Sequence, residues 1–293
     1  MTALEVRRLA GSLGAEVRGI DLASATEEDA ARISDLLLEH MVLFFPDQHL
    51  TPDEHVAFGG LFGELESHPN LDLSRERPEF FELRAVDGAG GVADEWHSDL
   101  SCVEHPSKLS ILQTRVVPEV GGDTLWTNTC RAYEELSAPL RDLCDGLTAY
   151  HDAGPHLAPE RGWIHPVVRV HPETGRRALF VNEHFTRRIV ELSDAESTVL
   201  LGHLTRWVQQ PRFTVRYRWA PGTVAMWDNR CTQHHVLNDF EGERVIQRVT
   251  VMGDDPQPAV PLPRWEPSSS RTATFWRDDA LRRQLKVQRP PTG

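Results

Sequence analysis

From about residue 80 onward, Pro- and Gly-containing turns divide the chain into short apolar runs. Short runs rich in β-branched and aromatic residues are typical of strands, and breaks this frequent leave little room for long helices. Many short strands joined by turns predict an antiparallel sandwich or barrel. The predicted strands span residues 80–84, 108–117, 167–170, 178–181, 214–219, 223–227 and 245–252.

Helical segments decorate this framework. Residues 26–40 keep helical spacing of apolar residues, and Thr26 is followed three positions later by Asp29, which is the spacing of a capping box. Residues 51–62 begin Thr-Pro-Asp-Glu, with a capping residue, Pro at the first helical position and acids in the first turn. The expected fold class is mainly β with helical decorations (α+β), and two further helices are predicted at 129–147 and 193–209.

The chain shows no internal repeat and no linker-like break, so residues 1–293 are predicted to form a single domain. Its Pro-, Ser- and Arg-rich end, roughly residues 257–293, is expected to be a C-terminal tail on the surface. The hydrophobic content of 40% is enough for a sizeable core. A net charge of −13 argues against a nucleic-acid partner, because such proteins normally present a basic face.

The cysteines and the N-terminus indicate the compartment. The four cysteines are scattered and form no CxxC pair, which fits a reducing environment and provides no zinc-ribbon spacing. The N-terminus lacks an apolar signal-peptide core, and no stretch approaches the ~20 apolar residues that a membrane span needs. We therefore expect a cytoplasmic protein with no membrane partner.

Three residues suggest a metal site. His97 and Asp99 are two positions apart, so on a β-strand they would share one face. His234 lies far downstream and could join them only if a β-fold brings the two segments together. Two His and one carboxylate, with open positions opposite, form the ligand set of non-haem Fe(II) oxygenases. The sequence thus predicts His97, Asp99 and His234 as metal ligands and as the catalytic centre.

The sequence pattern leaves two questions open. His235 competes with His234, because adjacent strand residues point to opposite faces and periodicity does not choose between them. Two His and one Asp can also hold Zn²⁺ beside an activated water, as in a zinc-dependent hydrolase. A non-catalytic binding protein on a barrel scaffold is a further alternative, because a fold does not prove an activity.

Several motifs in order resemble the taurine dioxygenase family of Fe(II)/2-oxoglutarate-dependent oxygenases. The resemblance runs from about residue 4 to about residue 255. The motifs that carry it are LGAEVRGIDL, LFGELESHP, WHSD, GGDTLW, HPVVRVHPETGRRALFVNEHFTRRIV, and WDNRCTQH followed by Arg244 and Arg248.

The resemblance implies a double-stranded β-helix, or jelly-roll barrel, with Fe(II) as cofactor and 2-oxoglutarate and O₂ as cosubstrates. It selects His234 over His235 as the iron ligand, and it assigns Thr124 and Arg244 to the distal carboxylate of 2-oxoglutarate. The planar fork of an Arg suits a carboxylate bidentately, and a Thr hydroxyl adds one hydrogen bond. Arg248, four residues along the same strand face, can serve a second anion of the cosubstrate or of the substrate.

The resemblance also implies substrate contacts. His68 and Arg248 match residues that hold the sulfonate in taurine-cleaving members, and Phe185 matches a pocket aromatic. The chain departs from those members at Leu71, where they have Tyr, and at Ala93, where they have Asn; both polar contacts are lost. Residues 151–163 are also shorter than in the family, so a more open pocket is expected.

The predicted function is hydroxylation of a small anionic organosulfur substrate, such as taurine, another alkylsulfonate or an alkyl sulfate. Succinate and CO₂ are released, and a sulfonate also yields sulfite and an aldehyde. The same chemistry on an aryloxy or other carboxylic acid is the alternative. The resemblance further suggests a homodimer or homotetramer.

Overall fold

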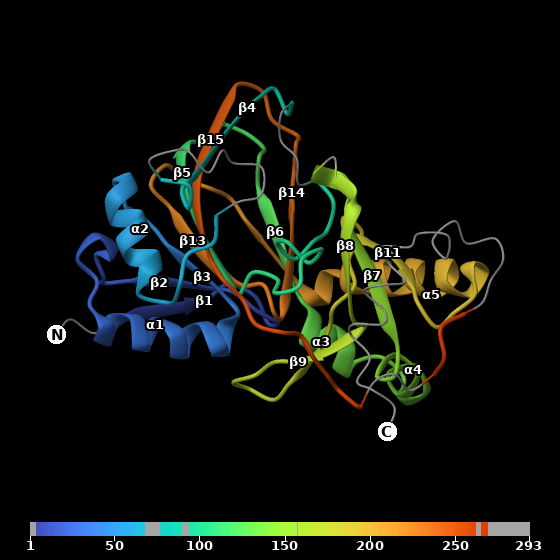
Figure 1. The fold of residues 1–293 in the computed structure, drawn as a ribbon. Helices are drawn as coiled ribbons and strands as arrows, with labels where there is room; N and C mark the ends of the chain where they lie inside the picture. Colours follow the sequence, from blue (N-terminus) through green and yellow to red (C-terminus); the bar gives the residue numbers. More distant parts are fainter. Residues whose placement is uncertain (1–3, 68–76, 90–93, 157, 262–264, 269–293) are drawn as a thin grey trace.

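In the computed structural model, the described residues are 4–67, 77–89, 94–156, 158–261 and 265–268 (Figure 1). The architecture is mainly β with few helices, as predicted. The largest sheet has seven strands, and all neighbours in it pair antiparallel except β2 and β3, which are parallel. In spatial order they are β1 (Glu5–Arg8), β2 (Ala15–Arg18), β3 (Val42–Phe45), β13 (Val224–Asp228), β5 (Leu109–Val116), β15 (Glu243–Val251) and β4 (Phe81–Val86).

Within the described residues, three smaller antiparallel sheets make up the rest of the β structure. The one that matters most for function is β12 (Thr214–Tyr217), β6 (Thr124–Asn128) and β14 (Thr232–Val236), in that order. The others are β11 (Thr186–Ile189) with β7 (Thr148–Ala153) and β8 (Ala158–Pro166), and β10 (Arg177–Leu179) with β9 (Val168–Val170) and β16 (Gln257–Pro258).

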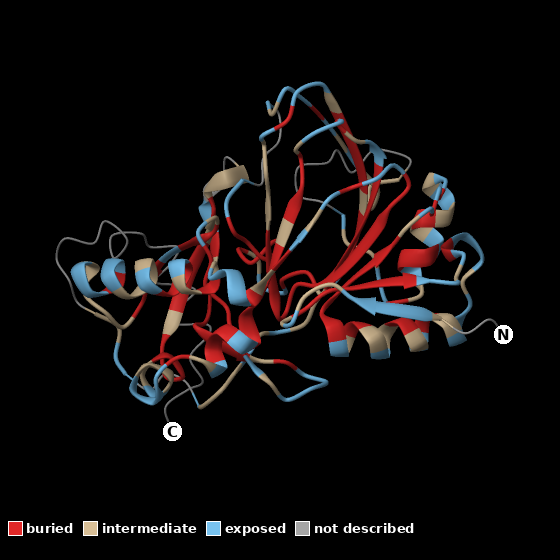
Figure 2. Cartoon of the chain, turned by 180° about the vertical axis from the view of Figure 1, so that it is seen from behind, coloured by how far each residue is buried: buried red, intermediate tan, exposed pale blue. Residues whose placement is uncertain are grey.

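Alternation along the strands gives the seven-stranded sheet two apolar faces. Leu43 and Phe45 of β3 point to the face covered by α1 (Glu27–His40) and α2 (Pro52–Gly60), where they pack with Ile33 and Phe58. Phe44 points the other way and packs with Trp126 of β6. The large sheet and the β12-β6-β14 sheet therefore pack face to face. Figure 2 shows α1 with its buried residues toward the sheet and its exposed residues outward.

The starts of three helices agree with the predicted ranges. Thr26, Thr51 and Ser193 each form a complete capping box at the starts of α1, α2 and α5 (Asp194–Val208). The single helix predicted over 129–147 was wrong: it is divided into α3 (Thr129–Glu134) and α4 (Ala138–Cys144). Pro139 lies in the first turn of α4, where a missing N–H is tolerated, whereas inside a longer helix it would break the ladder. Short 3₁₀ turns lie at Leu22–Ser24 (η1), Gly154–His156 (η2) and Pro211–Phe213 (η3).

The start of the predicted tail is attached to the body. β16 pairs with β9, and the backbone N–H of Ser268 donates to the carbonyl of Val190 at 3.1 Å. Residues 262–264 and 269–293 of the predicted tail lie outside the described residues. Among the described residues, no helix is both long and apolar enough to cross a membrane.

Candidate active site

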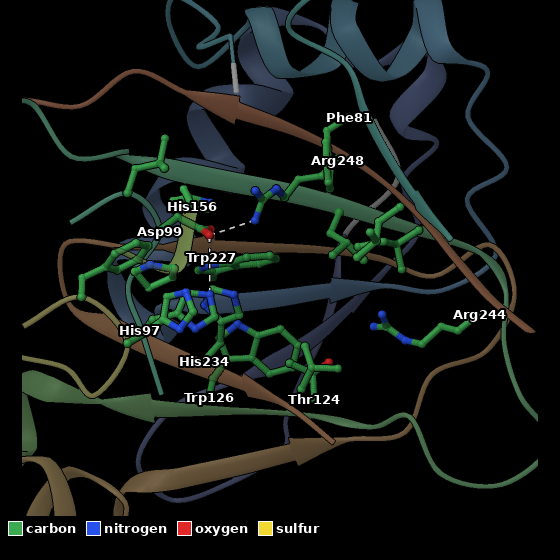
Figure 3. Close-up of a pocket in the computed structure, with 18 of the residues that line it drawn as sticks. Phe81, His97, Asp99, Thr124, Trp126, His156, Trp227, His234, Arg244 and Arg248 are labelled. Atoms are coloured by element: carbon green, nitrogen blue, oxygen red, sulfur yellow. Dashed lines mark hydrogen bonds and ion pairs between the residues drawn. The ribbon is translucent and has the colours of Figure 1, made fainter. Parts of the chain in front are cut away.

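A cavity lies between the large sheet and the β12-β6-β14 sheet, and it brings together most of the residues predicted for the site (Figure 3). The large sheet supplies Leu112, Trp227, Arg244, Ile246 and Arg248, and the small sheet supplies Thr124, Trp126, His234 and Val236. The residues from sequentially distant strands meet here because the two sheets pack face to face.

His97, Asp99 and His234 lie side by side in this cavity. One potential ligand atom from each residue can be chosen so that all three lie within 4.8 Å of one another, and all three residues are buried. The backbones of His97 and His234 form an isolated antiparallel bridge, and their ring centroids are 4.1 Å apart. This spacing and donor set match what a single metal ion needs.

One part of the reasoning from sequence was wrong. Residues 97–99 are not a strand: His97 makes the isolated bridge, and the chain turns at Asp99 and Leu100. Leu100 has a left-handed φ of 48°. The His and the Asp therefore converge because the chain turns, and not because alternate residues share a strand face.

The histidines of the triad are neutral. Burial lowers the pKa of His234 to about 4, and burial together with the neighbouring His234 lowers that of His97 well below its usual value. The Nδ1 of His97 lies 2.8 Å from the carbonyl oxygen of Glu95, so Nδ1 carries the proton and Nε2 is left to bind a metal.

Asp99 is ionised. Burial by itself would raise its pKa, but Arg248, the two histidines and a hydrogen bond from Ser110 lower it below the usual range. Neutral imidazoles and an ionised carboxylate are the protonation states that metal coordination requires.

The phase of β14 separates the two adjacent histidines. His234 lines the cavity with the other two triad residues. His235 lies on the opposite side of the strand, half-buried, with its ring centroid 5.5 Å from that of Trp96. The structure thus places the residue selected by the family resemblance, and not its neighbour, in the cavity.

Arg244 is the most unusual cation of the site. It is 5% exposed, and desolvation by burial is the cause that lowers its pKa to about 10. Its Nη2 has no hydrogen-bond partner, and no carboxylate within the described part of the chain pairs with it. A buried guanidinium without a counter-charge is costly unless a ligand anion supplies one. The arrangement is suited to binding a carboxylate.

Thr124 and Arg248 also line the cavity. The indole N–H of Trp219 donates to the Thr124 hydroxyl oxygen at 3.0 Å, so the proton of this hydroxyl is available to a ligand. Arg248 donates from Nη1 to the Oδ1 of Asp99 at 2.8 Å, a contact that the sequence did not predict. The expectation that Arg244 and Arg248 share a strand face agrees with the structure.

The substrate residues are only partly described. Phe185 lines the cavity, 6.3 Å from His97 between ring centroids. His68, Leu71 and Ala93 lie outside the described residues. Sequence reasoning assigned no role to further lining residues, of which only His184 lies in one of the quoted motifs: Phe81, Pro155, His156, His184 and Trp219.

The segment predicted to leave the pocket more open reaches the cavity. Residues 151–163 contain the end of β7, the η2 turn and part of β8, and Pro155 and His156 contribute to the lining. The ring of His156 lies 5.6 Å from Phe185 and 6.4 Å from His184 between centroids. Although this segment is shorter than in the family, it forms part of the cavity wall.

A second group of possible ligands, His171, Asp228 and Cys231, has a different explanation. Both carboxylate oxygens of Asp228 accept hydrogen bonds from Arg230, and one also pairs with His171 at 3.0 Å. A carboxylate saturated in this way has no oxygen left for a cation. The group is a buried ion-pair network that fixes the turn before β14.

Comparison with known proteins shows the family of this chain. Residues 5–250 match the model of the family described as taurine catabolism dioxygenase TauD, TfdA family. The chain belongs to this family. It is 39% identical to an alkylsulfatase of Acinetobacter baylyi, over 86% of each protein. It is 40% identical to an alpha-ketoglutarate-dependent sulfate ester dioxygenase of Pseudomonas putida, over 86% of this chain and 91% of that protein.

The fold of this chain also matches that of a solved structure. A taurine dioxygenase from Burkholderia xenovorans superimposes with a TM-score of 0.78 at 38% identity, and the match covers 87% of this chain and 93% of that one. Membership of the family and the dioxygenase class therefore rest on nearly the whole chain and not on an isolated motif.

Proposed function

We propose that this protein is an Fe(II)- and 2-oxoglutarate-dependent dioxygenase in which His97, Asp99 and His234 hold the iron. The donor set supports this, because two imidazoles and one carboxylate on one side of a metal leave the other side for cosubstrate and O₂. The face-to-face packing of the two sheets supports the proposal that residues 1–293 form one domain around a double-stranded β-helix. Assembly into a dimer or tetramer stays a prediction.

The observation that carries the proposal is the buried Arg244 in the same cavity as the triad. 2-Oxoglutarate has a keto-acid end that chelates iron and a distal carboxylate that needs a cation. Arg244 and the Thr124 hydroxyl would hold that carboxylate. A zinc-dependent hydrolase or a simple binding protein would leave this unpaired buried cation without a role.

Bound Fe(II) and 2-oxoglutarate supply the oxidation of a substrate C–H bond by O₂, with release of succinate and CO₂. The protein orients the ligands and limits access of water. Trp126, Trp227 and Leu112 make the cavity wall around the triad largely apolar, which strengthens charge interactions inside it.

For the substrate we propose an anionic organosulfur compound, with an alkyl sulfate ester or alkylsulfonate preferred to taurine. Arg248 provides the cation, and Phe81, Leu100 and Phe185 provide apolar surface for a carbon chain. The names of the two relatives at 39% and 40% identity support a sulfate ester. Hydroxylation of the carbon that bears the ester oxygen gives an adduct that releases sulfate and an aldehyde. A sulfonate would release sulfite and an aldehyde.

Two measurements test this function. Fe(II) and 2-oxoglutarate added without O₂ should produce a weak visible charge-transfer band, and its absence in folded protein would refute the oxygenase proposal. Succinate release should then be measured with hexyl sulfate, hexanesulfonate, taurine and phenoxyacetate. We expect the two alkyl compounds to give the highest kcat/KM; a response to phenoxyacetate alone would favour the carboxylic-acid alternative.

A further inference from the structure

The two oxygens of the Asp99 carboxylate have different surroundings. Oδ2 accepts a 2.6 Å hydrogen bond from the hydroxyl of Ser110 on β5. Oδ1 lies on the cavity side, 3.8 Å from Nε2 of His97 and 2.8 Å from Nη1 of Arg248. Oδ2 is therefore held by a buried residue of the protein interior, and Oδ1 faces His97, another proposed metal ligand.

The direction of the Ser110 hydrogen bond is fixed by Asn229. The amide Nδ2 of Asn229 donates to the Ser110 hydroxyl oxygen at 2.9 Å, so that oxygen is already an acceptor. Its own proton is thus directed to Asp99, whose ionised carboxylate is an acceptor only.

Asn229 also holds the backbone of the same aspartate. Its Oδ1 accepts from the backbone N–H of Asp99 at 3.2 Å and from the indole N–H of Trp227 at 3.0 Å. The hydrogen bonds form a closed ring from Asp99 through Asn229 to Ser110 and back to Asp99. We refer to Ser110 and Asn229 as the carboxylate clamp.

The clamp is rigid and dry. Ser110 is 0% exposed and Asn229 is 2% exposed. The backbone N–H of Asn229 donates to the carbonyl of Lys108 at 2.9 Å, which ties the residue to the start of β5. Buried polar groups in a fully satisfied network resist rearrangement, because breaking one bond leaves a desolvated group unpaired. Asp99 therefore has one preferred orientation before any metal binds.

We propose that Ser110 and Asn229 are positioning residues that make Asp99 a monodentate metal ligand through Oδ1. Both oxygens accept a hydrogen bond, and their positions distinguish them: Oδ1 lies 3.8 Å from the Nε2 of His97, the neighbouring ligand atom, whereas Oδ2 is bonded to the fully buried Ser110. Oδ1 is therefore presented to the metal, and Oδ2 stays out of the coordination sphere. A carboxylate that bound through both oxygens would occupy a position required for the keto acid or O₂. The inference rests on the proposed iron site and adds the residues that keep its open positions free.

The test uses Ser110→Ala and measures the affinity of the full-length protein for Mn(II) by calorimetry, with no turnover involved. Loss of a residue that hydrogen-bonds a metal ligand typically weakens metal binding by 10–100-fold. We therefore expect the Kd for Mn(II) to rise by at least about 10-fold. Ser107→Ala is the matched control. Ser107 is also buried, at 1% exposure, and also donates a 2.6 Å bond to a carboxylate, that of Glu66 outside the triad. We expect its Mn(II) affinity to match that of the wild type.

Further measurements separate positioning from general stability. The visible spectrum of the Co(II)-loaded protein reports the coordination of the metal, and we expect it to change in Ser110→Ala but not in Ser107→Ala. If Ser110→Ala does not fold, Ser110→Cys provides the same comparison with similar volume and only a weak donor. Wild-type affinity and spectrum in the folded Ser110 variant would overturn the clamp alone. A wild-type protein that binds no Mn(II) would overturn the proposed function, and the clamp with it.

Discussion

The backbones of His97 and His234 are joined by a reciprocal pair of hydrogen bonds. The N–H of His97 donates to the carbonyl of His234 at 3.1 Å, and the N–H of His234 donates to the carbonyl of His97 at 2.8 Å. Because these bonds use only the backbone, a side chain at either position can be removed without removing the bridge. Changes in metal binding can therefore be separated from loss of the site's architecture.

The first prediction compares two adjacent histidines. His234→Ala removes a proposed ligand. Loss of a residue that only hydrogen-bonds a metal ligand typically weakens metal binding by 10–100-fold, so loss of the ligand should weaken Fe(II) binding by more than this. His235→Ala changes a half-buried ring on the other side of β14 and should retain Fe(II) affinity within about threefold. Anaerobic Fe(II) titration of both variants checks this. The reverse order would show that the strand phase at the site is different in solution.

The second prediction concerns Arg244. Arg244→Leu should raise the Kd of 2-oxoglutarate by about 100-fold, because two hydrogen bonds to a charged group contribute about 1.5 kcal/mol or more each. The melting temperature without ligand should be unchanged or higher, because the buried guanidinium has no carboxylate partner within the described residues. Calorimetric titration with 2-oxoglutarate and thermal melts measure the two effects.

Arg115→Leu at the exposed end of β5 is the control for Arg244→Leu. It should leave 2-oxoglutarate binding unchanged. If Arg244→Leu binds 2-oxoglutarate normally but melts at a much lower temperature, then the role of Arg244 is structural and the cosubstrate site lies elsewhere.

Local features were predictable from the sequence, because their causes are local. The helix starts at Thr26, Thr51 and Ser193 are fixed by capping boxes, each of which depends on residues three positions apart. Pro139 was equally visible in the sequence, but the helix break before it was not predicted. The bridge between His97 and His234 depends on long-range pairing, which no local pattern reports.

The site was predicted unevenly for the same reason. Ligand chemistry indicated the triad, but the choice of His234 over its neighbour needed the family resemblance. His156 and His184 reach the cavity from turns; His156 lies in none of the quoted motifs, and the motif that contains His184 did not indicate a role for it. Asn229 belongs to the WDNRCTQH motif and lies in a turn, but no sequence pattern indicates its bond to the backbone of Asp99.

The third prediction tests His156 as part of the anion pocket. Burial and the neighbouring His184 and Arg248 lower its pKa, so at pH 7 it is a neutral donor within the electrostatic reach of Arg248. His156→Phe keeps a ring against Phe185 but removes the N–H. We expect the KM for hexyl sulfate to rise about 10-fold, the typical cost of one hydrogen bond to a charged group, and the KM for 2-oxoglutarate to stay unchanged.

Succinate release over a range of each substrate gives both constants for His156→Phe. His203→Phe, an exposed position on α5, is the matched control and should behave as the wild type. Equal increases in both KM values would indicate a general distortion of the cavity and not a contact with the sulfate group.

The last prediction concerns the pH dependence of stability, and it uses a histidine away from the site. His55 on α2 is fully buried, and its Nε2 lies 3.0 Å from the carbonyl of Ile111. Burial lowers its pKa to about 4, whereas the unfolded chain has the ordinary value near 6.5. Between these values the unfolded state binds a proton that the folded state does not. The free energy of unfolding should therefore fall as pH decreases from about 6.5 to 5.

The expected contribution of His55 is about 1 kcal/mol per pH unit in that window, where few carboxylates titrate. His55→Gln keeps a donor for Ile111 but does not titrate, so it should reduce the slope of unfolding free energy against pH by that amount. Urea unfolding at pH 7, 6 and 5 measures the slope, and His203→Gln on the surface should leave it unchanged.

Because His165 is also buried, with a pKa lowered to about 3, the His55 variant should retain part of the slope and not lose all of it. A slope equal to that of the wild type would mean that His55 is protonated in the folded protein, which its buried position beside Phe80 and the β5 backbone makes unfavourable.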